Sequence, residues 1–428
     1  MLDIKIIREH PERVKESILR RHLDPAKANV EELLALDGRW RELQGSCDTM
    51  RARRNERSDQ IKSLKGEDRQ AAVDEVRGLK TELAAVEAEL ERVQGERDAL
   101  LRRMPNLLAE DVPNGKTDAD NLEVARWGTI PSFDFEPRDH VELGALTGTL
   151  DFDRAAKVTG ANFYYLKHEA ALLELALCSF AASRLVPAGF RPIATPDLAK
   201  AQVLEGIGFA PRGPETQVYS VENSDLCLVG TAEITVGGYH SGEILDADEL
   251  PLRYLGLSHC FRTEAGAYGR ESRGLYRVHQ FTKAEMFAIC APEDSVALHE
   301  EIRGHEEALM QALGLPYRVV NVCSGDLGAP AAKKYDLEAW MPGRKAYGEV
   351  TSCSNCTDYQ SRRLNIRFRR DAKAAPQVVH MLNGTALAIS RTLIAIYENY
   401  QERDGSIRIP EVLRPFLPGT EVIPRRRG

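Results

Sequence analysis

A seven-residue repeat between residues 30 and 104 constrains the fold more than any other feature. Apolar side chains recur at two positions of each heptad, pause at "KGEDRQ" (65–70) and stop before Pro105. This pattern is typical of helices that pack along one seam. The seam comprises Leu33, Trp40, Cys47, Arg54 and Ile61, Leu36, Leu43, Met50, Arg57 and Leu64, then Leu79, Val86, Val93 and Leu100 with Val76, Leu83, Leu90, Arg97 and Met104. Two helices of about 35 residues, folded back near Gly66, would form an antiparallel hairpin roughly 50 Å long.

The first half of this hairpin carries a basic run. Nearly every residue off the seam is charged, so the hairpin must project rather than form a core. In "RARRNERSDQIKSLK" (51–65), six lysines and arginines outnumber Glu56 and Asp59. A solvated coiled-coil face accounts for such charges without a ligand. Arg54 and Arg57, however, occupy seam positions where they weaken packing, which favours a ligand.

Bulk composition excludes several classes of protein. The chain has 428 residues, 43% hydrophobic and 29% charged, with a net charge of −8, as expected of a soluble protein of two or three domains. It has no run of about 18 apolar residues and no secretory pattern at its start, so we expect a cytoplasmic protein without membrane contact. Eight scattered cysteines suit a reducing compartment. The single CxxC (353–356) lacks a second ligand pair, so no zinc is expected.

The composition changes beyond the hairpin. A segment rich in Asn, Asp, Gly and Pro follows it, and we expect an N-terminal domain at 1–104, a linker at 105–125 and a second domain at 126–428. Residues 162–190 read as a short aromatic strand and an apolar helix, 363–369 as a half-buried strand, and 383–401 as a glycine turn entering a buried helix. Because strands and helices alternate irregularly, we predict an α+β fold, an antiparallel sheet flanked by helices.

Four polar clusters interrupt apolar sequence in the second domain. They are "LCLVGTAEITV" (226–236), expected to be strand-like, "CFRTEAGAYGRESRGLYRVHQFTKAEMF" (260–287), "YGEVTSCSN" (347–355) and "LNGTALAISR" (382–391). A charge within an apolar segment is costly unless it is paired. Arginines facing an anion, and carboxylates holding a cation or an amine, would satisfy all four clusters together. The chain lacks a GxxxxGK[ST] phosphate loop and a complete GxGxxG.

These clusters, in this order, resemble the motifs of the seryl-tRNA synthetases, a family of class II aminoacyl-tRNA synthetases. "FRTEAGAYGRESRGLYRVHQFTKAEMF" resembles their second signature motif, "GTAE" their serine-binding segment and "LNGTALAISR" their third motif. "GFRPIATP" (189–196) is similar to their dimer-interface motif, and the hairpin resembles their tRNA-binding arm. The resemblance covers essentially the whole chain. It implies that the protein joins L-serine to tRNA(Ser) with ATP and Mg²⁺, and that it is a homodimer through the region ending at Pro196.

The resemblance also implies roles for the residues that would bind ATP. Arg262 would contact the α-phosphate and the serine carboxylate, and Glu264 would accept from the adenine amino group. Phe281 and Arg391 would stack on the two faces of adenine, with Arg277 and Arg391 near the γ-phosphate. Arg262 and Arg391 are the predicted catalytic residues. The full ATP set is Arg262, Glu264, Arg277, Val278, Phe281, Glu349, Ser352 and Arg391, of which Glu349 and Ser352 would hold Mg²⁺.

The remaining implied roles concern the amino acid and the tRNA. An ammonium group requires carboxylates, and a serine hydroxyl requires hydrogen-bonding partners. The implied serine site is Thr231, Glu233, Arg262, Glu285, Asn383 and Thr385. The implied tRNA contacts on the arm are Arg51, Arg53, Arg54, Arg57, Lys62 and Lys65. A loop carrying Arg270, Glu271 and Arg273 would meet the tRNA acceptor end.

Several alternatives stay open at this point. Ala386 and Ser390 stand where glycine is frequent in the class, and Thr385 where serine is common, which is consistent with ordinary variation or with a specialised, inhibitor-resistant copy. An amino-acid ligase that loads a carrier protein would share the fold, although it has no RNA for a basic arm to bind. A scaffold with an inactive domain is disfavoured, because every residue type that faces ATP is present. Charging of selenocysteine tRNA is left open as well.

Overall fold

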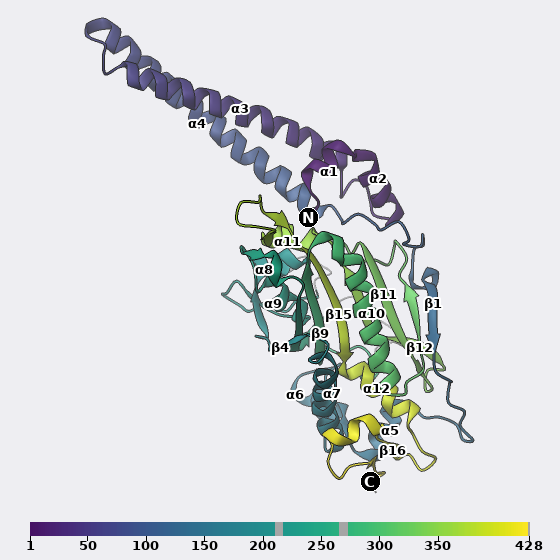
Figure 1. Ribbon diagram of the computed structural model, residues 1–428. Coiled ribbons are helices and arrows are strands. Elements are labelled where there is room, and N and C mark those ends of the chain that lie inside the picture. Colours follow the sequence, from purple (N-terminus) through teal and green to yellow (C-terminus); the bar gives the residue numbers. More distant parts are fainter. Residues whose placement is uncertain (210–216, 265–272, 427–428) are drawn as a thin grey trace. The chain divides into compact units, whose positions relative to one another are not determined.

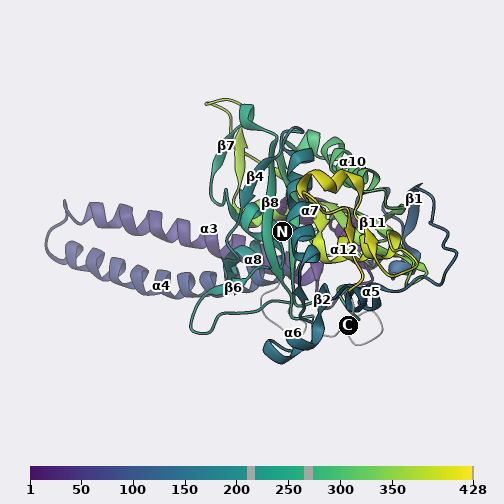
Figure 2. The same cartoon turned by 90° about the horizontal axis from the view of Figure 1, so that it is seen from below.

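Two long antiparallel helices dominate the N-terminal part of the chain. The computed structural model describes residues 1–209, 217–264 and 273–426, and it divides into two units, Met1–Leu107 and Leu108–Gly428. In the first unit, the short helices α1 (Ile4–Glu9) and α2 (Pro11–Arg20) precede α3 (Val30–Gln60) and α4 (Gly66–Arg103). The helices α3 and α4 run side by side in both views (Figure 1, Figure 2). The predicted hairpin is therefore confirmed.

The seam of the hairpin follows the heptads. Every predicted seam residue is buried or half-buried, whereas most intervening positions are exposed. Asn29 caps α3 by accepting a hydrogen bond from the Glu32 amide at 3.1 Å. Gly66 has φ +57, so a glycine lets the chain turn into α4. Asp37, fully buried on α3, receives two 2.7 Å hydrogen bonds from Arg8 and thereby ties α1 to the hairpin.

The second unit is built on an eight-stranded sheet. Neighbouring strands pair antiparallel, except for β4 and β8, which pair in parallel at one edge. The strand order is β1 (Leu122–Trp127), β10 (Tyr317–Asn321), β11 (Lys333–Met341), β12 (Ala346–Asn355), β15 (His380–Ala388), β9 (Gln280–Cys290), β8 (Leu252–Phe261), β4 (Arg191–Ala194). The α+β prediction is confirmed.

Helices pack against this sheet and bury its central strands. α10 (Ser295–Ala312) contacts β12 and β15, while α7 (Glu169–Leu185) and α12 (Ile389–Asn399) contact β9. Figure 1 shows α10 lying along the sheet. Three short helices, α8 (Ala201–Ile207), α9 (Ala232–Gly238) and α11 (Tyr359–Leu364), pack near the β8 and β9 end of the sheet. The core is apolar on both sides of β9, where Met286, Phe287 and Ile289 are fully buried.

Shorter elements complete the second unit. They are α5 (His140–Thr147), β2 (Leu150–Asp151), α6 (Phe152–Val158), β3 (Tyr165–Leu166), β5 (Leu198–Lys200), β6 (Leu226–Leu228), β7 (Ile244–Asp246), β13 (Arg367–Arg369), β14 (Gln377–Val378), β16 (Ile407–Arg408) and β17 (Val422–Ile423). Within the described ranges, no helix combines the length and the apolar character needed to cross a membrane.

Three local predictions were wrong. The strand-like run at 226–236 is strand only in β6, because the Thr231 side chain caps a helix, α9, by accepting from the Glu233 amide at 3.2 Å. Residues 363–369 divide between α11 and β13, with Asn365 in the left-handed conformation at φ +56 ending the helix. The expected glycine turn at 383 lies inside β15, where Gly384 pairs with Met286 on one side and Cys353 on the other.

Candidate active site

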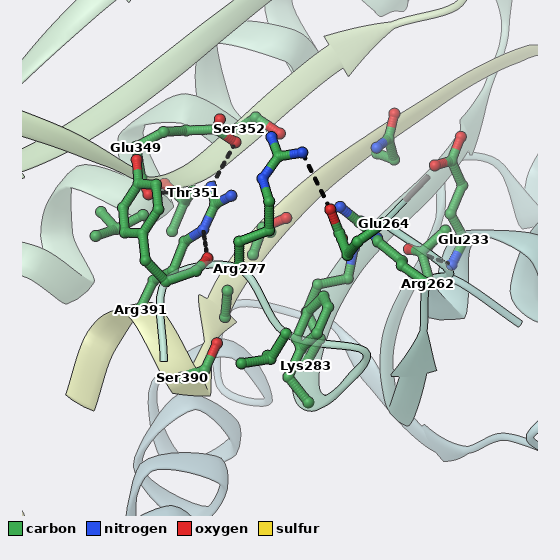
Figure 3. Close-up of a pocket in the computed structure, with 18 of the residues that line it drawn as sticks. Glu233, Arg262, Glu264, Arg277, Lys283, Glu349, Thr351, Ser352, Ser390 and Arg391 are labelled. Carbon is green, nitrogen blue, oxygen red and sulfur yellow. Dashed lines mark hydrogen bonds and ion pairs between the residues drawn. The ribbon is translucent and has the colours of Figure 1, made fainter. Parts of the chain in front are cut away.

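A pocket of about 820 Å³, including the solvent at its mouth, opens beside β9, β12 and β15 in the second unit (Figure 3). The predicted ATP and serine residues gather here from five separate stretches of sequence. Those lining the pocket are Thr231, Glu233, Arg262, Glu264, Arg277, Val278, Phe281, Glu349, Ser352, Asn383, Thr385 and Arg391. Glu285 is fully buried and does not line the pocket.

One end of the pocket holds four alternating charges. Glu264 and Arg277 form an ion pair at 3.1 Å, and Arg391 and Glu349 form another at 3.2 Å, both visible in Figure 3. Arg391 also donates to the Glu349 carbonyl at 3.1 Å. Burial acts to raise the pKa of Glu349, but the charges of Arg391 and Lys334 outweigh burial and hold that pKa below its ordinary value. Glu349 is therefore ionised at neutral pH and keeps Arg391 in place.

Two arginines pack on aromatic rings in this pocket. The Arg262 guanidinium lies 5.3 Å from the centre of the Phe281 ring, and its Nε donates to the Gly230 carbonyl at 3.3 Å. The Arg391 guanidinium lies 4.7 Å from the centre of the Tyr276 ring. Such contacts orient guanidinium groups while leaving N–H donors for an anion.

The other end of the pocket is polar and built on β9 and β15. Glu285 pairs with Lys283 at 2.5 Å and accepts hydrogen bonds from Asn383 and Thr385, each at 3.3 Å. The predicted serine-binding residues Asn383 and Thr385 thus line the pocket directly, with Glu285 holding them from behind. Because residues two apart on a strand face the same side, Lys283 and Glu285 belong to one cluster.

Glu233 is the half-buried carboxylate of this polar end. Its Oε1 accepts a 2.7 Å hydrogen bond from the side chain of Gln360. Burial, aided by the charge of Glu285, raises the pKa of Glu233 to about 7, and the Gln360 bond, Lys283 and Arg262 oppose that rise. Arg262 thus acts on Glu233 at one end of the pocket and on Glu349 at the other.

The predicted Mg²⁺ ligands offer two oxygen donors. The Glu349 side chain is 39% exposed and Ser352 lines the same pocket. Within the described ranges, no three His, Cys, Asp or Glu side chains converge as a metal site. Carboxylate and hydroxyl oxygens suit Mg²⁺, which usually takes one or two protein ligands and completes its shell with phosphates and water. The donor set is compatible with an ion carried by a nucleotide.

Sequence reasoning did not identify several residues of this site. Tyr276, Lys283 and Thr351 line the pocket, and Gln360 lies behind Glu233. Lys283 could have been predicted, because it stands two residues before Glu285 on the same strand. Gln360 offered none, because its contact depends on helices distant in sequence. Among the unusual positions, Ser390 lines the pocket and Ala386 is buried at an irregularity of β15 between Thr385 and Leu387.

The arm cations fall into two groups. Four form ion pairs within the hairpin, namely Arg51 with Glu87, Arg53 and Arg57 with Glu75, and Lys62 with Asp59. Arg54 donates to Asn55, and neither it nor Lys65 has a carboxylate partner in the part of the chain that the structure describes. Of the predicted acceptor-end loop, Arg270 and Glu271 lie outside the described residues, and Arg273 pairs with Asp139 at 2.9 Å.

Comparison with known proteins gives consistent matches. Residues 1–108 match the seryl-tRNA synthetase N-terminal domain, and residues 217–400 match the class II tRNA synthetase core domain for G, H, P, S and T. The chain is 56% identical to the serine–tRNA ligase of Dictyoglomus turgidum, covering 100% of both chains, and 52% identical to that of Treponema denticola, covering 97% and 98%. The seryl-tRNA synthetase from Pyrococcus horikoshii complexed with ATP superposes with a TM-score of 0.94 at 43% identity and 100% coverage of both chains.

Proposed function

Because this chain belongs to the seryl-tRNA synthetase family and is a serine–tRNA ligase, we propose that its pocket forms seryl-adenylate between the two charged ends described above. ATP lies toward Glu264, Arg277, Glu349 and Arg391. L-serine lies toward Glu233, Asn383 and Thr385. The observation that supports this arrangement is the position of Arg262, which lines the pocket together with Glu233 at one end and Glu349 at the other.

The first step joins the serine carboxylate to the α-phosphorus. A carboxylate oxygen forms the new P–O bond, and the bond from phosphorus to the pyrophosphate oxygen breaks. The carboxylate is ionised at neutral pH, so no general base is required. Arg262 neutralises the charge at the reacting phosphorus, and Arg277 and Arg391 neutralise the leaving phosphates. Glu349 and Ser352 would hold Mg²⁺ together with the nucleotide, and the bound ion would supply further charge neutralisation.

The second step transfers the seryl group to tRNA(Ser). A terminal ribose hydroxyl attacks the seryl carbonyl and loses its proton to solvent, the ester bond forms, the bond from the carbonyl carbon to the phosphate oxygen breaks, and AMP leaves. The hairpin binds the tRNA through its basic run, with Arg54 and Lys65 best placed because no carboxylate neutralises them within the described residues. Selenocysteine tRNA is a second candidate acceptor, and it is tested by measuring seryl transfer to it in place of tRNA(Ser). We also place the enzyme in the cytoplasm, as is usual for this family.

The enzyme acts as a homodimer through the region that ends at Pro196. Support comes from β4, an exposed edge strand that pairs with β8 alone among the described residues, and from α7, whose Leu172 and Leu175 are 50% and 64% exposed. Large exposed apolar residues near a sheet edge are typical of covered surfaces. Light scattering of the wild type and of Leu175→Glu tests this, and a wild-type monomer at micromolar concentration would contradict it.

Amino-acid-dependent ATP–pyrophosphate exchange tests the proposed chemistry. Across all twenty amino acids, we expect exchange with serine and at least a thousand-fold less with alanine, because a site that bonds a hydroxyl leaves its polar groups unpaired without one. Absence of exchange with serine would overturn the proposal. A carrier-protein ligase would instead show exchange without charging tRNA(Ser).

A further inference from the structure

Gln360 links three helices behind the polar end of the pocket. It lies on α11, is fully buried, and uses its Nε2 to donate to the Glu233 Oε1 at 2.7 Å and to the Ile207 carbonyl at 3.0 Å. Glu233 lies in the first turn of α9, and Ile207 is the last residue of α8. One amide therefore satisfies an unpaired carbonyl at a helix end and fixes a carboxylate in the neighbouring helix.

The orientation of this amide follows from its partners. With the amide reversed, its oxygen would face two other oxygens, so the donor must point at Glu233 and Ile207. Its own oxygen is buried without a hydrogen-bond partner among the described residues. An unpaired buried oxygen is costly, and an apolar side chain of similar length would fill the site without that cost. The donor function is what distinguishes glutamine from such a side chain at this position.

Glu233 uses only one of its two oxygens in this contact. Oε1 is held by Gln360, whereas no donor to Oε2 is present in the described part of the chain. The backbone of Glu233 is fixed as well, because its amide donates to the Thr231 hydroxyl at 3.2 Å. A carboxylate anchored through one oxygen presents the other in a defined direction.

We propose that Gln360 is a positioning residue that holds Glu233 with Oε2 directed into the pocket, ready for the ammonium group of the amino acid. This inference rests on the proposed function, since it assumes that Glu233 receives the ammonium. Gln360 touches neither substrate and acts through Glu233 alone. A donor to Oε1 also favours the ionised form of Glu233, which is the form an ammonium requires.

The test uses Gln360→Met, which keeps the length of the side chain and removes the donor. The matched control is Gln401→Met. Gln401 is also buried and donates to two carbonyls, of Arg138 at 3.0 Å and Glu398 at 2.8 Å, but neither of these partners lines the pocket, whereas Glu233 does. In ATP–pyrophosphate exchange we expect Gln360→Met to raise the KM for serine roughly 10- to 100-fold, as for loss of a hydrogen bond to a charged group, with the KM for ATP within about twofold.

A double-mutant cycle separates positioning from a general packing effect. In a Glu233→Gln background, adding Gln360→Met should change the serine KM less than about twofold, because the residue through which Gln360 acts is already altered. Gln360→Glu, a second variant of similar size, places an acceptor against Glu233 and should bind serine at least as poorly as Gln360→Met. If Gln360→Met fails to fold, the KM for serine is measured with Gln360→Glu instead.

The outcomes are distinct. If the wild type shows no serine-dependent exchange, the proposed function fails. If the wild type is active but Gln360→Met matches Gln401→Met, or if the serine and ATP KM values rise together, the positioning role is overturned. A full effect of Gln360→Met in the Glu233→Gln background would also overturn it.

Discussion

The Arg277 guanidinium lies 3.1 Å from the Glu264 carboxylate, closing an ion pair across the nucleotide end of the pocket. Glu264 holds this position with a backbone φ of +49, a conformation that is uncommon for residues with a side chain. Such backbone strain is frequent at functional sites. Because the pair satisfies both side chains before any ligand arrives, a nucleotide must offer each of them a better partner.

Glu264→Gln should weaken the preference for adenine. A carboxylate accepts from an exocyclic amino group and repels the guanine carbonyl, whereas a glutamine can turn its amide to donate to that carbonyl. We expect the ratio of kcat/KM for ATP to that for GTP to fall at least about tenfold, measured by pyrophosphate exchange. Glu301→Gln, at an exposed ion pair with Arg253, is the control. An unchanged ratio would remove Glu264 from base recognition.

Arg262→Ala should abolish adenylate formation. Arg262 is proposed to touch both the serine carboxylate and the α-phosphate, so its removal takes away charge stabilisation that appears in the transition state. We expect kcat for exchange to fall by roughly a thousand-fold or more. Arg370→Ala, which removes an exposed arginine paired with Glu293, should be nearly wild type. A fall of less than tenfold in Arg262→Ala would contradict the role.

Serine use should depend on the ionisation of Glu233, whose pKa is raised to about 7. The groups that act on it are Glu285, Lys283 and Arg262, together with the Gln360 amide. Since the ammonium group needs the ionised carboxylate, kcat/KM for serine should rise as pH increases toward about 7 and then level off. A pH profile of exchange tests this. In Glu233→Gln, the rise of kcat/KM for serine with pH should be absent.

The same group should affect stability in the opposite direction. A carboxyl whose pKa is raised in the folded state binds more protons there than in the unfolded state. Its contribution to the free energy of unfolding is therefore complete below the ordinary pKa of 4.5 and is lost as pH rises through about 7. Denaturant unfolding at pH 5 and pH 8 should show this loss in the wild type, and a smaller one in Glu233→Gln. Equal pH dependence in the two proteins would contradict it.

Some of the arm cations should act in tRNA binding and others in the stability of the hairpin. Replacing Arg54 and Lys65 with alanine should raise the KM for tRNA(Ser) severalfold and leave pyrophosphate exchange unchanged, because removing phosphate contacts weakens binding uniformly. Arg57→Ala should instead lower the stability of the hairpin, since it breaks the pair with Glu75. Lys80→Ala, on α4, is the control. Deleting residues 30–104 should preserve exchange while charging collapses, and charging that survived would exclude the arm as the tRNA site.

Features with a local cause were predictable from the sequence. The hairpin was predictable because apolar residues recur at the same two positions of each heptad. The pocket residues were predictable because their motifs follow the same order as in a known family. The errors have tertiary causes. The segment around Asn383 resembles a turn but is a central strand, because β9 and β12 pair with it on both sides. Thr231 looked like a strand residue because the sequence does not show that its hydroxyl caps a helix.

Gln360 shows why part of the site could not be predicted. Nothing in "DYQSRR" separates this glutamine from a solvated one. Its partners, Ile207 and Glu233, lie 153 and 127 positions away and come together only when α8, α9 and α11 pack. A periodic pattern reports which face of an element is buried, but not which residue of another element will lie opposite.

The composition of the hairpin seam has a mechanical consequence. Near the first unit's short helices, Leu33, Val93 and Leu100 close the seam with apolar contacts, whereas toward the turn the seam also includes Arg57, which pairs with Glu75. Exposed ion pairs weaken as salt is added, while apolar contacts do not. The two ends of one rod thus respond differently to the same solution. At low ionic strength the whole hairpin should stay paired, and in concentrated salt it should fray first at its distal end.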